Sequence, residues 1–213
     1  MNQVLLLVFQ LSVLLFSVII HEVSHGTVAL KLGDRTAKDA GRLTLNPLNH
    51  LDFFGSFILP LSLFLLSGGQ FVLGWAKPVP YDPRNLKNPK SGSGLIGAAG
   101  PISNLLVAAV FGLALRLILP LAGFGVVETL IFLINYIVFI NVLLAIFNLL
   151  PIPPLDGSGI LFSLLPNNFN RLKEFLLRYG FFILIIFIFF GFQLLIPLVH
   201  WIYQAIVGPA AIF

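Results

Sequence analysis

The residues with the clearest chemical potential are His21, Glu22 and His25, which form an H-E-x-x-H pentad. On a helix, residues four positions apart lie almost above one another, so both imidazoles would face the same side one turn apart. Two histidines in this arrangement are typical zinc ligands, and the glutamate between them can accept a proton from an attacking water molecule. The pentad therefore predicts a metal centre of the hydrolytic type.

The surroundings of the pentad are unusual for a peptidase motif, because it lies within an apolar run at 3–31. Roughly 20 apolar residues suffice to cross the hydrocarbon core of a bilayer. A charge at the bilayer centre costs about 2.5–3.5 kcal/mol on insertion scales, so ionisable groups there usually mark a functional site. A chance pentad is the alternative, and this location argues against it.

The composition is that of an integral membrane protein. The chain is 58% hydrophobic and 9% charged, with a mean hydropathy of +1.02, whereas soluble domains carry about 25% charged residues. Cysteine is absent, which excludes disulfides, thiolate metal sites and a cysteine nucleophile. A net charge of only +4 gives no indication of nucleic-acid binding.

Six apolar runs predict an all-α membrane protein. We expect one domain, 1–213, that forms a polytopic helical bundle of about four to six transmembrane segments. The runs are 3–31, 53–73, 95–119, 126–150, 179–199 and 200–213. The first does not resemble a cleaved secretory signal, because no basic residue precedes it and cleavage nearby would detach or destroy the pentad. We expect it to be a retained helix.

The run at 53–73 has two possible paths. Pro60 interrupts it and a Ser-Gly-Gly-Gln sequence ends its apolar part, so it is either a short tilted span or a re-entrant segment. If it re-enters, eleven of the twelve lysines and arginines, all except Arg116, lie on one face, which the positive-inside rule makes cytoplasmic. If it spans, this bias nearly vanishes. We therefore expect a re-entrant segment near 53–73.

The re-entrant path has a consequence for the metal centre. With it, the helices at 3–31 and 126–150 run parallel and both end on the cytoplasmic side. The pentad and the segment just after residue 150 would then lie at similar depth. This segment is therefore a place to look for a further ligand.

A catalytic zinc commonly takes three protein ligands, and the third must come from His50, His200 or an acidic residue. Most acidic residues lie among basic residues in polar loops, as ordinary surface carboxylates do. Asp156 instead follows three prolines between two apolar stretches. The prolines would end the helix and keep the backbone extended, and Gly157 would permit a sharp turn that aims the carboxylate into the bundle. A surface turn is the alternative, with His50 and Asp52 as the next candidate ligands.

Several motifs, in this order along the chain, match a known family. They are His21–His25, Gly41-Arg42-Leu43-Thr44-Leu45-Asn46-Pro47, Gly74-Trp75-Ala76-Lys77-Pro78-Val79-Pro80, Gly100-Pro101-Ile102-Ser103-Asn104 and Asn148-x-x-Pro151-x-x-x-Leu155-Asp156-Gly157. The chain resembles the site-2 protease family of intramembrane zinc metalloproteases (peptidase family M50). The resemblance is to its small bacterial and archaeal members, which lack a PDZ domain.

The resemblance implies one Zn²⁺ per chain, bound by His21, His25 and Asp156, with Glu22 as general acid/base. It also implies cleavage of transmembrane segments of membrane-protein substrates (regulated intramembrane proteolysis), in the cell membrane and with the site accessed from the cytoplasmic side. The family further places asparagines near the catalytic centre, where Asn148 and Asn104 would contact the substrate or its oxyanion. Without the resemblance, asparagines in membrane helices often bond a neighbouring helix.

The family also implies a small membrane-embedded β-hairpin near 37–47. The residues Arg42–Leu45 alternate in polarity between Gly41 and an Asn-Pro pair, which fits a strand. An exposed edge there could pair with an extended substrate. A plain connecting loop is the alternative.

Two other classes of function remain open from the residues alone. A non-hydrolytic metal-binding transporter or sensor is the leading rival, because intramembrane His/Asp clusters also occur on ion pathways. Such a protein would not need Glu22 as a base. The second class is a structural membrane protein in which the pentad is incidental.

Overall fold

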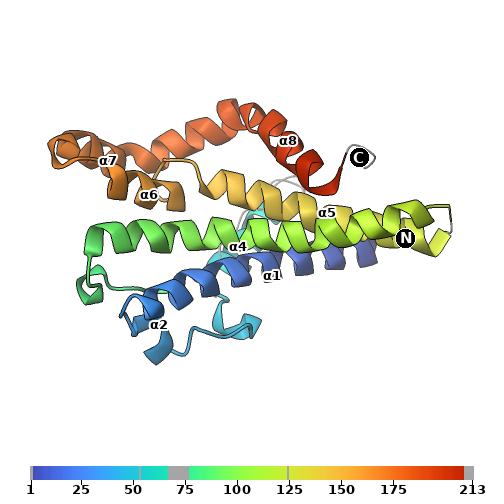
Figure 1. The fold of residues 1–213 in the computed structure, drawn as a ribbon, viewed down its shortest axis with the longest axis horizontal. Helices are drawn as coiled ribbons and strands as arrows, with labels where there is room; N and C mark the ends of the chain where they lie inside the picture. The colour runs from blue at the N-terminus through green and yellow to red at the C-terminus, as the bar shows by residue number, and fades with distance from the viewer. Residues whose placement is uncertain (1, 53, 67–76, 124, 209–213) are drawn as a thin grey trace.

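The structure, a computed structural model, describes residues 2–52, 54–66, 77–123 and 125–208, and all of its regular elements are helices (Figure 1). The α-helices are α1 (Gln3–Lys31), α2 (Thr36–Asp39), α3 (Leu59–Leu66), α4 (Pro89–Ile118), α5 (Gly125–Asn148), α6 (Asp156–Leu164), α7 (Asn170–Ile186) and α8 (Ile196–Val207). Short π-helical turns precede α3, at Phe54–Ile58, and follow α7, at Phe187–Gly191.

Four helical segments among the described residues are long and apolar enough to cross a membrane: Gln3–Lys31, Pro89–Leu121, Gly125–Asn148 and Asn170–Leu194. A shorter apolar helix, Ile196–Val207, follows the last of them. The prediction of an all-α, multi-pass membrane protein is therefore confirmed.

Helix α4 is the centre of the bundle, because it packs against α1, α5, α6 and α8. In Figure 1, α1 and α5 run in the same direction and α4 runs against both. A buried apolar cluster joins α4, α5 and α8 and includes Leu115, Val138, Val142, Val199 and Tyr203. This cluster lies in the half of the bundle away from the end of α1, and it fixes α5 relative to α4.

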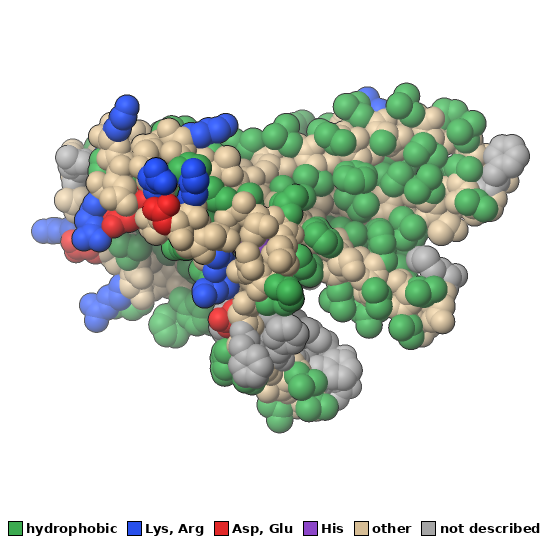
Figure 2. Space-filling model, turned by 90° about the horizontal axis from the view of Figure 1, so that it is seen from below, with side chains coloured by type: hydrophobic (Ala, Val, Ile, Leu, Met, Phe, Trp, Pro, Cys, Tyr) green, Lys and Arg blue, Asp and Glu red, His purple; other side chains and the backbone are tan. Residues whose placement is uncertain are grey.

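The basic side chains gather at one end of the molecule. Figure 2 shows the lysines and arginines concentrated where α1 ends and α4 and α7 begin, with hydrophobic side chains over most of the remaining surface. Arg116 lies near the opposite end of α4. The parallel course of α1 and α5 directs both helices toward this basic end (Figure 1).

A buried carboxylate ties the loop after α1 to the loop before α4. Asp34 is fully buried, and it accepts hydrogen bonds from the Thr36 hydroxyl (2.5 Å), the Asn85 side chain (2.8 Å) and the Asp82 amide (2.8 Å). Burial alone would raise the pKa of Asp34, but these hydrogen bonds outweigh it and lower the pKa to about 2. These hydrogen bonds hold the C-terminal end of α1, the helix that carries the pentad, against the loop before α4.

The prediction of a β-hairpin near 37–47 is wrong. The chain there forms α2, a turn, and a short 3₁₀ helix at Pro47–Asn49. The Asp34 carboxylate accepts from the Thr36 amide at the start of α2, and Gly41, with a φ of +66°, ends the turn that follows. Arg42 donates to the backbone carbonyl of Lys77 instead of lying along a strand. These local hydrogen bonds therefore outweigh the alternating pattern.

The predicted re-entrant segment lies partly outside the described residues. Its described part is helical from Phe54 to Leu66. The residues that flank this segment lie next to each other, because the Lys77 amide donates a hydrogen bond to the His50 carbonyl at 2.8 Å.

Candidate metal centre

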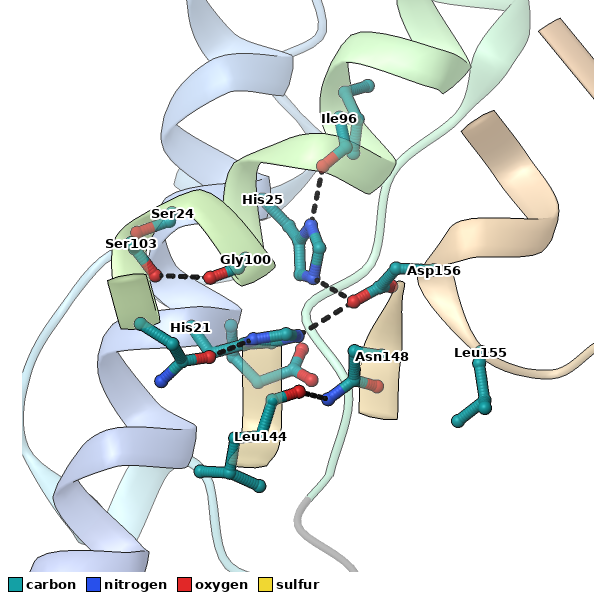
Figure 3. A network of polar contacts seen from close by, with 12 residues as sticks. His21, Ser24, His25, Ile96, Gly100, Ser103, Leu144, Asn148, Leu155 and Asp156 are labelled. Carbon is teal, nitrogen blue, oxygen red and sulfur yellow. Dashed lines mark hydrogen bonds and ion pairs between the residues drawn. The ribbon is translucent and has the colours of Figure 1, made fainter. Parts of the chain in front are cut away.

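Three potential metal ligands from two distant parts of the sequence converge in one place (Figure 3). His21 and His25 come from α1, and Asp156 comes from the first turn of α6. Nε2 of His21 lies 2.8 Å from Oδ2 of Asp156, and Nε2 of His25 lies 3.3 Å from the same oxygen. One potential ligand atom of each residue lies within 4.8 Å of the others. The two histidines are 6% and 8% exposed.

The hydrogen bonds on the far side of each imidazole determine which nitrogen faces the centre. Nδ1 of His25 donates to the carbonyl of Ile96 (2.6 Å), and Nδ1 of His21 donates to Oδ1 of Asn104 (2.6 Å). Each Nε2 then carries a lone pair. Two lone pairs and a carboxylate oxygen at these distances repel one another unless a proton or a metal cation lies between them, so the donor set calls for a positive charge at its centre.

The donor set fits zinc. Two histidine nitrogens and one carboxylate oxygen are a common ligand set for catalytic zinc. Two ligand atoms on a tetrahedral zinc, each about 2.0–2.1 Å from the metal, lie roughly 3.3 Å apart. The His25–Asp156 separation already has this value, and the His21–Asp156 contact would lengthen by about 0.5 Å. Small side-chain rotations could supply this change.

Helix α4 forms the floor of the centre through residues that lack side chains. A Cβ atom on Gly100 would lie 2.5 Å from Nε2 of both His21 and His25, and one on Gly97 would lie 2.9 Å from the backbone oxygen of Asp156. Ile96 and Asn104, which hold the two Nδ1 atoms, lie on the same helix. Helix α4 thus positions all three potential ligands.

The expected role of Gly157 is wrong in its detail. Gly157 lies within helix α6 and is not among the described glycines with a positive φ, so it does not form a sharp turn. Its missing Cβ instead allows contact with the backbone carbonyls of Leu149 and Leu150 at the end of α5. The carboxylate is aimed by this close packing. Helix α5 itself ends before Pro151, as the prolines predicted.

Glu22 lies beside the three potential ligands and has a backbone partner that the sequence did not reveal. The amide of Val79 donates to Oε2 of Glu22 at 2.8 Å. The segment around Val79 approaches α1 closely because Gly26 has no side chain: a Cβ there would lie 2.7 Å from Val79 Cγ1 and 2.6 Å from Leu43 Cδ2. The Val79 amide therefore holds one carboxylate oxygen of Glu22 in place.

The two asparagines from the sequence motifs lie in different places. Asn148 is half-buried, donates to the Leu144 carbonyl (3.0 Å) and lines the same cavity as the potential ligands. Asn104 is fully buried and lies behind His21, outside the residues that line this cavity. A substrate contact suits Asn148 and does not fit the position of Asn104.

The alternative third ligands lie elsewhere. His50 is fully buried, with its Nε2 2.8 Å from the Thr44 carbonyl. Asp52 accepts from the Gly55 amide at the start of the π-helical turn. Within the described part of the chain, His21, His25 and Asp156 are the one group of three or more His, Cys, Asp or Glu residues that could hold a metal ion.

A cavity of about 350 Å³ surrounds the centre and is lined by Glu22, Pro78, Val79, Asn148 and the potential ligands, among others. A second cavity of about 470 Å³ adjoins it, since Tyr81, Ser93 and Gly159 line both. The second cavity extends toward the basic end and includes Lys90 and Lys173 in its lining.

Comparisons with known proteins indicate the family to which the chain belongs. The family model described as "Peptidase family M50" matches residues 116–187. YwhC of Bacillus subtilis is 36% identical over 81% of this chain and 76% of its own length. Rip2 of Mycolicibacterium smegmatis is 30% identical over 81% of this chain, and MJ0611 of Methanocaldococcus jannaschii is 32% identical over 67%.

Each of these three relatives is named as a proposed zinc metalloprotease. The chain spans 63% of the length of Rip2 and of MJ0611. No solved structure matches the chain at a significant level. The extent and identity of the match to YwhC, together with the family model, show that the chain belongs to peptidase family M50, the site-2 protease family of membrane zinc metalloproteases.

Proposed function

We propose that this protein is an intramembrane zinc endopeptidase that hydrolyses peptide bonds in transmembrane segments of other membrane proteins. His21, His25 and Asp156 hold one Zn²⁺, and Glu22 is the general acid/base. One observation carries the proposal: Nε2 of His21 and Nε2 of His25 converge on a carboxylate oxygen of Asp156 beside Glu22. The two histidines and Glu22 lie on α1, an apolar helix of 29 residues.

The depth of the centre supports cleavage within the bilayer. At 1.5 Å per residue, His25 and His21 lie about 9–15 Å along α1 from its end at Lys31. The basic residues that follow Lys31 belong in the headgroup region. The centre then lies inside the hydrocarbon layer, on the side of the basic residues.

Bound zinc would supply a Lewis acid that polarises the scissile carbonyl and activates water. Glu22 accepts a proton from the attacking water and delivers it to the leaving amine as the C–N bond breaks. The Val79 amide holds Oε2 of Glu22, which leaves Oε1 for this proton transfer. Asn148, whose side chain lines the cavity, donates a hydrogen bond to the substrate carbonyl oxygen.

The substrate must expose its backbone before it reaches the centre. A transmembrane helix hides its amides in hydrogen bonds, and the cavity of about 350 Å³ admits a few residues of extended chain and no intact helix, which is about 10 Å wide. Substrates with Gly or Pro near the cleaved bond unwind most easily, so we expect them to be preferred.

Access from the cytoplasmic side is supported by the charge distribution. The adjoining cavity extends from the centre toward the end that carries Lys90 and Lys173, and lysines and arginines near membrane helices favour the cytoplasmic face. Water and the released chain would pass through this second cavity. We place the protein in the cell membrane in this orientation.

A re-entrant path for 53–73 is part of the proposal. The hydrogen bond between Lys77 and His50 places the chain before and after this segment together. The helical part from Phe54 to Leu66 is about 20 Å long at 1.5 Å per residue, less than the roughly 30 Å of a hydrocarbon core.

The substitution Glu22→Gln tests the function, because it preserves the shape of the side chain and removes the base. The expected result is stoichiometric zinc in the purified protein with cleavage of a transmembrane test substrate abolished. A variant that cleaves as well as the wild type would exclude Glu22 as the base and would favour a non-hydrolytic role for the metal.

A further inference from the structure

We infer that Asn104 is a positioning residue for the metal centre: with Asn141 and Ser17 it locks the His21 imidazole in the tautomer that binds zinc through Nε2. This inference rests on the zinc site proposed above. It assigns to a buried asparagine on α4 a role that differs from substrate binding.

The Asn104 side chain has no access to the cavity, and every polar atom it carries is used. It is fully buried. Its Oδ1 accepts from Nδ1 of His21 at 2.6 Å, and its Nδ2 donates to Oδ1 of Asn141 at 2.9 Å and to the Ser17 carbonyl at 3.2 Å. The side chain is therefore held between α1 and α5 behind His21.

The orientation of both amides follows from their backbone partners. The carbonyl of Ser17 can only accept, so the nitrogen of Asn104 must face it and the oxygen must face His21. The Asn141 nitrogen likewise donates to the Ile137 carbonyl and to the Ser17 hydroxyl, both at 2.9 Å. Turning either amide would bring donor against donor or acceptor against acceptor.

The hydrogen bonds form one chain with a single direction. His21 donates to Asn104, Asn104 donates to Asn141, and Asn141 donates to the hydroxyl of Ser17. Each acceptor is made a better acceptor by its own donation, so the chain strengthens the bond at Nδ1 and makes Nε2 a better ligand.

The two histidines differ in how their tautomers are set. His25 donates to a backbone carbonyl, that of Ile96, which no substitution of a side chain removes. His21 depends on the side chain of Asn104. The Asn104 substitution should therefore weaken one ligand and leave the other in place.

Asn135 provides a matched control, because it is another buried asparagine that joins two helices. It lies on α5 and accepts from the Tyr203 hydroxyl of α8, and it is not among the residues that line the cavity. If buried asparagines act here only through helix packing, substitutions of Asn104 and Asn135 should have the same effect on metal binding.

The test is zinc affinity, measured by competition with a chelator in purified protein, for the wild type, Asn104→Leu, Asn104→Asp and Asn135→Leu. Loss of an outer hydrogen-bond partner of a metal ligand typically lowers affinity 10–100-fold, which we expect for Asn104→Leu. Asn104→Asp keeps an acceptor for Nδ1 of His21, but it sets its second carboxylate oxygen against Oδ1 of Asn141 and the Ser17 carbonyl, so it should recover only part of the loss. Asn135→Leu should remain within about twofold of the wild type.

A second measurement uses the wild type alone and so does not depend on how a variant folds. Four histidines are present, so ¹⁵N spectra of histidine-labelled protein can be assigned by single substitutions. The zinc-loaded protein should show His21 protonated on Nδ1 and bound through Nε2. The opposite tautomer would overturn the inference.

The outcomes separate this inference from the proposed function. Wild-type affinity in Asn104→Leu, or an equal loss in Asn135→Leu, overturns the role of Asn104 while leaving the zinc site intact. Wild-type protein that binds no zinc overturns the zinc site and this inference together.

Discussion

The backbone amide of Val79 donates a 2.8 Å hydrogen bond to Oε2 of Glu22, across 57 positions of sequence. Val79 lies between Pro78 and Pro80, neither of which has an amide hydrogen. The one N–H that this short segment offers is therefore directed at the predicted base. Gly26, one turn after Glu22 on α1, makes the approach possible.

The substitution Val79→Pro removes this donor without adding a polar group. A hydrogen bond to a charged group contributes about 1.5–3 kcal/mol, so we expect kcat to fall about 10–100-fold while the zinc content stays at one per chain. The measurements are cleavage kinetics and metal analysis. Val79→Ala is the control, because it keeps the N–H and should lose much less activity. Equal losses in the two variants would assign the effect to side-chain packing.

The substitution Gly100→Ala should disrupt metal binding through sterics alone. The added Cβ would lie 2.5 Å from Nε2 of His21 and of His25, so both rings must move from the positions that face Asp156. We expect zinc affinity to fall at least tenfold, measured by chelator competition. Gly125→Ala is the matched control, since a Cβ there meets nothing within 4 Å. Normal zinc binding by Gly100→Ala would contradict the role of α4 as the floor of the centre.

The substitution Asn148→Ala separates substrate binding from metal binding. Asn148 lines the cavity, and one of its two N–H donors is used by the Leu144 carbonyl. If the other stabilises the developing oxyanion, its loss should lower kcat about 10²-fold with unchanged zinc affinity. Kinetics and metal analysis on the same preparation decide the matter. A loss of zinc in parallel with activity would place Asn148 among the metal-positioning residues.

The buried carboxylate of Asp34 predicts a pH dependence of stability. Its pKa is about 2 in the folded protein because four hydrogen bonds outweigh its burial, and it is about 3.9 in an unfolded chain. A lowered pKa stabilises the fold above the unfolded value, and this stabilisation is lost as the pH falls from about 4 toward 2.

The variant Asp34→Asn should therefore be less stable than the wild type at neutral pH, and its Tm should fall less steeply between about pH 4 and 2. Thermal unfolding of purified protein across this range measures both effects. Parallel Tm profiles for the two proteins would show that Asp34 keeps an ordinary pKa. Asp39→Asn, at a solvent-exposed ion pair with Arg35, serves as the comparison.

The sequence was sufficient for the helices and for half of the metal centre. Helix periodicity places His21 and His25 on one face of a single element, and the apolar run around them requires a membrane span, so neither depends on the rest of the fold. The distribution of basic residues predicted that α1 and α5 run in the same direction, as Figure 1 shows. Asp156 was selected for its position between apolar stretches, and the structure brings it to the pentad.

Tertiary structure decided how these residues are held. The tautomer of His25 depends on the Ile96 carbonyl, the floor depends on missing side chains at Gly97 and Gly100, and the predicted base is held by a backbone amide. Every residue carries a backbone carbonyl, and almost every residue carries a backbone N–H. In a sequence, a glycine that allows a tight contact cannot be told from a glycine that forms a turn. Such groups leave no signal of residue type, so only the packing of α4 against α1 and α6 could reveal them.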